Sequence, residues 1–315
     1  MIMPAPVMIT TYTRIGHLQR TIEALLKNDL AKETSVFVYV DGPLPGDEEK
    51  VSAIISFLAM VSGFAALNVI VRPQNLGAHE NAKRANYEVL DKYGSMIRME
   101  DDNVTAPGFL RFMNLALTKY KEDSNVFSIT GYCPPIMIPN DYRYDAFFLK
   151  RFMGWGCGLW RDRLDDAYHQ ITSEEFKEFT ANKQLSRAFI EGGGKDMLNM
   201  LEAVADGRLD AADVVAMYTQ FLKDQYTLYP TQSLVQNIGM DATGVHCDDT
   251  DYFDVPLSNK TTFSLPDHLV VDPRIVMSNR EFWNNRKYKN PQGIFRRVIN
   301  KLKRESALLW QKLAQ

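Results

Sequence analysis

Short apolar runs alternate with helical patterns through the first 130 residues of the chain. Runs rich in β-branched and aromatic residues predict buried strands at residues 6–12, 35–40, 67–71, 95–99 and 125–130. Between them, apolar residues recur with the helical period and predict helices at residues 15–30, 48–61, 78–93 and 107–120. Strands and helices that alternate every ~25–30 residues are typical of βαβ units. The pattern therefore predicts an α/β fold with a Rossmann-like, mostly parallel twisted sheet flanked by helices.

The second half of the chain is less regular and more helical. Helical patterns dominate residues 173–222, with a glycine-rich break at residues 192–194, and short strands are expected at residues 226–229 and 233–235. In the tail, residues 293–313, apolar side chains share one face and basic side chains cover the rest. This is the pattern of a basic amphipathic helix. We therefore expect one domain over residues 1–265, in two halves that meet at residue 130, and a C-terminal extension over residues 266–315.

Composition narrows the functional class. The net charge of −3 gives no global basic field that would favour nucleic acid. Cys133, Cys157 and Cys247 are widely spaced and odd in number, which argues against a disulfide framework or a zinc site. The N-terminus lacks the charged region of a secretory signal, and no apolar run reaches the roughly 18–20 residues of a membrane span. We therefore expect a cytoplasmic location.

Polar residues follow the predicted strands at the places where ligands bind to parallel sheets, beyond the carboxyl ends. They are Thr11, Tyr12, Arg14, Asp41, Arg72, Asn75, Gly77, Glu100, Asp101 and Asp102. Turns that contain Asp, Asn and Gly also occur for structural reasons alone. Recurrence at four strand ends is what makes this edge of the sheet the candidate site.

Three adjacent acids, Glu100, Asp101 and Asp102, follow the apolar residues 96–99. At an effective dielectric near 20 and about 5 Å separation, each like-charged pair costs roughly 3 kcal/mol. A divalent cation such as Mg²⁺ or Mn²⁺ would offset that cost and bind substrate phosphates. The alternative is an acidic surface turn that caps the next helix. Arg98 is placed to hold one of the carboxylates when no metal is bound.

Several segments resemble the nucleotide-sugar glycosyltransferases of the GT-A fold. They are PVMITTYTRIGHLQRTIEALL (6–26), VFVYVDGP (36–43), RPQNLGAHENAKRAN (72–86), MEDDN (99–103), GWGCGLWRDRL (154–164) and YPTQSLVQNIGMDATGVH (229–246). MEDDN stands where that family has its DxD motif, in the EDD form of N-acetylglucosaminyltransferases and of bacterial family-two-like sugar transferases. Cys157, Gly158 and Leu159 depart from the Trp-Ala-Thr of the related sequence, whereas Gly154, Gly156 and Trp160 match it.

The resemblance implies a role for each matching residue. Asp102 would ligate the metal, with His246 joining it or the diphosphate, and Asp101 would face the donor's ribose or sugar. The remaining donor-site residues would be Thr11, Tyr12, Arg14, Asp41, Arg72, Asn75, Gly154 and Trp155, with Asp41 and Tyr12 at the nucleotide. The fold so implied is a GT-A domain over residues 1–265, with the donor half at residues 1–130 and the acceptor half at residues 131–265.

The implied activity is the inverting transfer of a sugar from a nucleoside-diphosphate donor to a saccharide hydroxyl, with Mn²⁺ or Mg²⁺ as the cofactor. UDP is the first candidate for the donor nucleotide. The acceptor would be a surface polysaccharide or a lipid-linked glycan. For the base, spacing from the glycine of NIG selects Asp213, although Ala212 replaces the family's tryptophan. Asp196, which follows the glycines at 192–194, competes with it, and Glu191 and Asp210 remain as lesser candidates.

Two other functions remain open at this point. A sugar-nucleotide nucleotidyltransferase would share the sheet and acidic site, but residues 10–14 (TTYTR) lack its glycine-rich loop. A non-catalytic nucleotide-sugar-binding module is kept open by the change to Ala212. The tail could bind an anionic membrane surface peripherally, on the inner face, or pack against the domain with its basic face in solvent.

Overall fold

The computed structural model describes residues 4–244 and 249–285. Its strands are β1 (Val7–Thr11), β2 (Ser35–Val40), β3 (Ala66–Val71), β4 (Ser95–Glu100), β5 (Asn103–Thr105), β6 (Val126–Thr130), β7 (Ala146–Leu149), β8 (Cys157–Trp160), β9 (Tyr226–Pro230) and β10 (Val235–Asn237). Its helices are α1 (Ile15–Leu26), α2 (Glu48–Met60), α3 (Ala78–Tyr93), α4 (Phe109–Lys119), α5 (Arg161–Leu164), α6 (Ser173–Ala181), α7 (Lys183–Gly193), α8 (Lys195–Ala205), α9 (Ala212–Leu222) and α10 (Pro273–Asn284).

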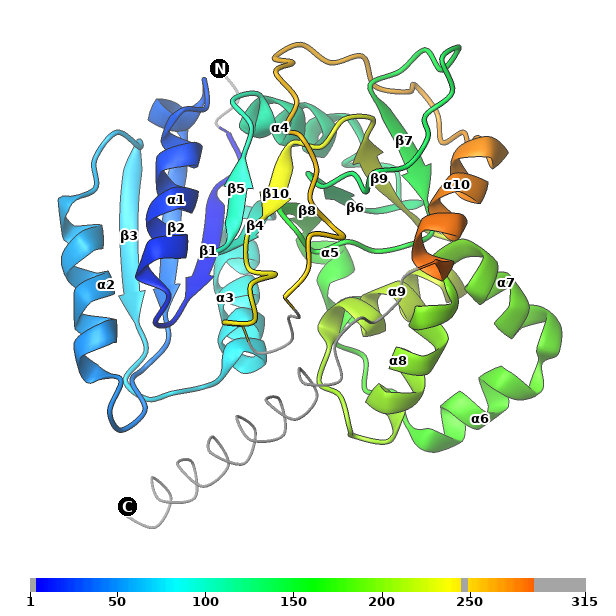
Figure 1. The fold of residues 1–315 in the computed structure, drawn as a ribbon, viewed down its shortest axis with the longest axis horizontal. Helices are drawn as coiled ribbons and strands as arrows, with labels where there is room; N and C mark the ends of the chain where they lie inside the picture. The colour runs from blue at the N-terminus through cyan, green and yellow to red at the C-terminus, as the bar shows by residue number, and fades with distance from the viewer. Residues whose placement is uncertain (1–3, 245–248, 286–315) are drawn as a thin grey trace.

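A central sheet of eight strands has the order β3-β2-β1-β4-β8-β6-β9-β7 (Figure 1). Strand β1 pairs in parallel with β2 and β4, and β2 pairs in parallel with β3. The chain order therefore reverses between β1 and β4, and a ligand crevice forms beyond the carboxyl ends of strands at such a point. The register pairs Thr10 with Glu100 and Thr11 with Val40, so these strand ends lie level.

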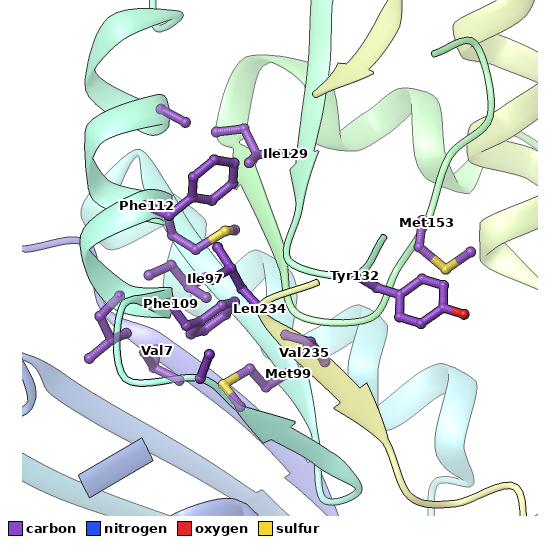
Figure 2. Close-up of a cluster of buried hydrophobic side chains, with 14 of the residues drawn as sticks. Val7, Ile97, Met99, Phe109, Phe112, Ile129, Tyr132, Met153, Leu234 and Val235 are labelled. Atoms are coloured by element: carbon purple, nitrogen blue, oxygen red, sulfur yellow. The ribbon is translucent and has the colours of Figure 1, made fainter. Parts of the chain in front are cut away.

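Apolar side chains cover both faces of the sheet and produce three layers. One core packs β1, β2 and β4 against α1, α2 and α4. The other packs the opposite face against α3 and the α7–α9 group. Figure 2 shows part of the first core, where Val7 and Ile97 meet Phe109 and Phe112 of α4. Val235, which begins β10, reaches the same core from the second half of the chain.

The alternating strands and helices of the first half are confirmed, with ends that shift by a few residues. The expected helix at 15–30 ends at Leu26, because Asn28 leaves the helix, donates to the carbonyl of Ala24 at 3.2 Å and accepts from the amide of Leu110 at 2.9 Å. Sequence reasoning missed β5, β7, β8 and α10. Strand β8 is antiparallel to both β4 and β6, so the sheet is mixed, although most of it is parallel.

Helix α10 opens the expected C-terminal extension and places Ile275 and Trp283 in the first core. The tail at residues 293–313 lies outside the described residues, as does His246. Within the described part of the chain, every helix is too short or too polar to cross a bilayer.

Candidate functional site

Two buried carboxylates follow β4 at the crevice between β1 and β4. Asp101 and Asp102 are 4% and 5% exposed. One oxygen of each is held by neutral donors: the hydroxyl of Thr11 donates to Asp101 Oδ2 at 2.9 Å. The side-chain amides of Asn103 and Asn237 donate to Asp102 Oδ1 at 2.9 and 3.1 Å. Both carboxylates are thus fixed in orientation with one oxygen left for a cation.

A single nitrogen of Arg14 contacts both of those remaining oxygens. Its Nη2 donates to Asp101 Oδ1 and, at 2.7 Å, to Asp102 Oδ2. Burial raises the pKa of Asp101 to about 6, and the Arg14 guanidinium opposes the rise. Burial acts to lower the pKa of Arg14, but the two carboxylates outweigh it and raise that pKa above its usual value. Arg14 was expected among the donor-site residues, and here its guanidinium is the counter-ion of the two carboxylates.

The short β5–β10 pair brings the NIG stretch onto these acids. The pairing register sets Asn237 opposite Asn103, and the amide of Ile238 donates to the carbonyl of Asp102 at 2.9 Å. A Cβ added at Gly239 would lie 2.1 Å from Asp102 Oδ2 and 3.0 Å from Arg14 Nη1. Only glycine therefore allows the chain to pass this close to the carboxylate.

Arg98 holds a second group of acids on the other side of the strand end. This arginine is 9% exposed, and its Nη2 donates to Glu100 Oε1 at 3.0 Å. Its Nη1 lies 3.6 Å from Asp213 Oδ1. Burial raises the pKa of Glu100 to about 7; Arg98 opposes the rise, and the nearby carboxylates of Asp102, Asp213 and Asp101 add to it.

Asp213 lies in the first turn of α9 and faces this group. Its side chain is 47% exposed. The loop after β7 passes directly over it, since a Cβ added at Gly154 would lie 2.7 Å from Asp213 Oδ2. The same loop is linked to Asp102 through Asn103. The amide of Gly156 donates to Asn103 Oδ1 at 3.0 Å, and the side-chain amide of Asn103 donates to Asp102. A carboxylate that is half exposed and surrounded by site residues can act as a general base.

The competing acid has a different environment. Asp196 is paired with Arg151, whose Nη2 and Nη1 donate to its two oxygens at 2.8 and 3.0 Å. Both side chains are nearly buried, at 7% and 5% exposure. The guanidinium of Arg151 also stacks 3.4 Å from the ring centroid of Trp283. Asp196 therefore holds α8 against the core near α10.

Asp41 joins the loops that follow β2 and β3. It is 3% exposed, and it accepts from the amides of Gly42, Leu76 and Gly77 at 3.0, 2.8 and 2.9 Å. The side-chain amide of Asn75 donates to the carbonyl of Gly42 at 2.7 Å and strengthens the same junction. The sequence left open a purely structural turn at Asp41, and these bonds give Asp41 such a role; a contact between Asp41 and a nucleotide base stays a prediction.

Tyr12 and Arg72 also brace neighbouring segments. The hydroxyl of Tyr12 donates to Asp47 at 2.8 Å and accepts from the amide of Leu44 at 2.9 Å. Burial raises the pKa of Tyr12 to about 12. Arg72 donates to Asn81 at 2.9 Å and to Glu88 at 2.8 Å, both on α3. Arg72 is thus directed along α3 and away from the β4 acids.

Trp155 packs mainly against other rings. It meets Tyr132 and Phe253 edge-on, at centroid distances of 4.7 and 5.4 Å. Its partial exposure leaves part of the ring available to a ligand.

A cleft of about 690 Å³ adjoins the acidic strand end. Asn237 and Ile238, which bond to Asp102, form part of its lining. The rest is largely polar and includes Arg20, Asp241, Asp249, Asp251 and Asp254. The volume lies within the range of small-molecule sites.

In the described part of the chain, the candidate metal ligands are two carboxylates, those of Asp101 and Asp102. No group of three or more His, Cys, Asp or Glu side chains there is arranged to hold a metal. Mg²⁺ and Mn²⁺ sites built from one or two carboxylates and substrate phosphates are common, so Asp101 and Asp102 fit such an ion.

Sequence reasoning missed Asn103 and Asn237 as the side chains that orient Asp102. Both stand inside motifs that it had singled out, MEDDN and NIG. Their amide side chains next to the acids were the available signal.

No protein-family model and no curated protein sequence matches the chain. Among solved structures, it is similar to the mannosyltransferase PcManGT from Pyrobaculum calidifontis, in complex with GDP-Man and Mn²⁺, with 14% identity and a TM-score of 0.36. That match covers 51% of this chain and 46% of the other. It is also similar to S. aureus TarS, with 12% identity, a TM-score of 0.44, and coverage of 82% and 41%. The matches span less than half of each solved chain, and their similarity is too low to assign an activity.

Proposed function

We propose that the chain is a GT-A-type glycosyltransferase that uses a nucleoside-diphosphate sugar and a divalent cation. UDP-sugars are the first candidate donors. The observation that carries the proposal is the balance of charge at the crevice. Glu100, Asp101, Asp102 and Asp213 gather around two guanidinium groups, those of Arg14 and Arg98. With all four acids ionised, the excess of two negative charges equals the charge of one Mn²⁺ or Mg²⁺ ion.

Asp102 would hold the ion. Asp101, which the resemblance places at the donor's ribose or sugar, would share in holding it, because both acids keep an oxygen that their neutral partners leave open. The bound ion would supply the positive charge that stabilises a leaving diphosphate. His246, which lies outside the described residues, is the proposed third protein ligand. Thr11, Asn103 and Asn237 position the two carboxylates and keep them from turning away.

Asp213 is the proposed base in an inverting transfer. Its half-exposed carboxylate would accept the proton of the acceptor hydroxyl as that oxygen attacks the sugar. Arg98 and the loop at Gly154 fix its position. Asp196 is the weaker candidate because both of its oxygens are bonded to Arg151.

The cleft beside Asn237 is the proposed acceptor site. Its carboxylates and amides match the hydroxyl groups of a saccharide, which donate and accept hydrogen bonds. We assign residues 1–130 to the donor, residues 131–265 to the acceptor and residues 266–315 to an extension. A growing surface polysaccharide or a lipid-linked glycan is the proposed acceptor.

The tail suggests a place for the reaction. A basic amphipathic segment at residues 293–313 would hold a cytoplasmic enzyme against the inner membrane surface. In vesicle flotation, the full chain should float with phosphatidylglycerol vesicles and not with phosphatidylcholine vesicles. Equal behaviour with both lipids would reject this contact.

The activity itself is tested with a panel of UDP-, GDP- and dTDP-sugars in Mn²⁺, by following donor turnover with saccharide acceptors. Consumption of one donor by wild type, with a large loss in Asp213→Asn, is the expected result. Donor binding without turnover would favour the non-catalytic module. Pyrophosphate release from a nucleoside triphosphate and a sugar phosphate would favour the nucleotidyltransferase.

A further inference from the structure

The guanidinium of Arg14 sits where two carboxylates converge. Its Nη2 bridges Asp101 Oδ1 and Asp102 Oδ2, the two oxygens that have no neutral donor among the described residues. A cation shared by both carboxylates would take the same position. We propose that Arg14 is a built-in counter-ion, which occupies the divalent-cation position in the metal-free protein and withdraws when the cation binds.

The mobile partner in this exchange is the arginine. The side chains of Asp101 and Asp102 are 5% and 7% exposed, whereas that of Arg14 is 23% exposed. Arg14 precedes α1 with a non-helical backbone. Within the described part of the chain, its side-chain hydrogen bonds go to these two carboxylates alone. Withdrawal therefore breaks no hydrogen bonds other than those to the two carboxylates, which the cation would then hold.

The exchange has a consequence for the donor. Asp101, Asp102 and Arg14 together carry one net negative charge, and a divalent cation in place of Arg14 neutralises the two acids. The released guanidinium then lies beside the cation, and guanidinium groups bind phosphate oxygens with two hydrogen bonds. Binding of the cation and of a nucleoside diphosphate should thus strengthen one another through Arg14. The inference rests on the proposed function, because it takes Asp101 and Asp102 as the metal ligands.

The test measures Mn²⁺ affinity by isothermal titration calorimetry on the full chain, without nucleotide and with UDP. Arg14→Gln should bind Mn²⁺ alone about 10-fold tighter than wild type or more, equivalent to about 1.4 kcal/mol. The gain in Mn²⁺ affinity that UDP gives should also be smaller for Arg14→Gln than for wild type, because only the direct contact between the cation and the diphosphate remains. The charge-matched control is Arg111→Gln, because Arg111 forms an exposed pair with Asp29 on the surface of α4. That control should bind Mn²⁺ within about twofold of wild type, well under the 1.4 kcal/mol of a tenfold change.

Thermal denaturation in chelator gives a second readout that needs no activity. Arg14→Gln should melt at a lower temperature than wild type in chelator. Added Mn²⁺ should raise the melting temperature of the variant by more than it raises that of wild type. If Arg14→Gln does not fold, Arg14→Lys replaces it, with a smaller rise in Mn²⁺ affinity expected because a lysine fits the bridging position less well. Unchanged or weaker Mn²⁺ binding in the folded Arg14 variant would overturn the inference.

Failure of the inference and failure of the metal site are separable. If Asp102→Asn abolishes Mn²⁺ binding while the Arg14 variant matches wild type, only the counter-ion role is wrong. If Asp102→Asn binds Mn²⁺ as wild type does, the proposed metal site itself is wrong.

Discussion

Asp101 should make the metal-free protein less stable as the pH rises. Burial raises the pKa of its carboxyl from 3.8 to about 6, so the folded protein keeps a proton that the unfolded chain has released. The stability linked to this group is complete below about pH 4 and is lost as the pH rises through 6. Asp101→Asn removes the titrating carboxyl. The free energy of unfolding of the variant should therefore increase relative to that of wild type as the pH rises through this range.

The size of this increase in relative stability follows from the shift in the pKa of Asp101. A change of about two pKa units corresponds to roughly 3 kcal/mol. Because the side chain is 5% exposed, solvent screening reduces this little. Urea denaturation of both proteins in chelator, from pH 4 to pH 7.5, measures the free energy of unfolding directly. The difference, variant minus wild type, should rise by up to about 3 kcal/mol between pH 4 and pH 7.

A surface acid provides the control. Lys119 holds the pKa of Asp267 below its usual range, so the stability linked to Asp267 changes only below about pH 4, and the difference for Asp267→Asn should stay nearly flat from pH 4 to pH 7.5. A difference for Asp101→Asn that stays flat, or that falls as the pH rises, would refute the assignment of a raised pKa to Asp101.

Three further substitutions test the division of labour among the acids. Asp213→Asn should lower turnover about 100-fold or more while donor affinity, measured by calorimetry, is retained; unchanged turnover would move the base to Asp196. Asp196→Asn should instead destabilise the fold by about 3–5 kcal/mol in urea, because it leaves Arg151 buried without its partner, and a neutral effect would contradict that role. Gly154→Ala should reduce turnover, since its Cβ displaces the Asp213 carboxylate; Gly16→Ala, which meets nothing within 4 Å, should not.

The first half of the fold and the position of the acids followed from local patterns. Alternating periods predicted β1 to β4 with their helices, and parallel pairing required the strand ends to share one edge. Thr11, Asp101 and Asp102 were all placed at that shared edge, and the hydroxyl of Thr11 donates to Asp101. The sequence also indicated that Arg98 would hold one of the acids, which proved to be Glu100.

What sequence patterns did not provide were contacts between distant segments. Strand β8 enters between β4 and β6, so the middle of the sheet depends on pairing partners that its four residues do not specify. Asn237 reaches Asp102 only because β10 pairs with β5. Arg14 was assigned to the donor site in general, since the sequence does not show which carboxylate a long side chain will reach. Asp196 read as a loop acid because its partner Arg151 lies 45 residues away.

Donor binding by Asp102→Asn tests the central claim most directly. Calorimetry with the UDP-, GDP- and dTDP-sugars should give Mn²⁺-dependent binding of at least one donor to wild type. Asp102→Asn, at equal folded content by circular dichroism, should lose that Mn²⁺-dependent binding. Equal donor affinity in the two proteins, with and without Mn²⁺, would contradict a metal-held nucleotide sugar at the end of β4.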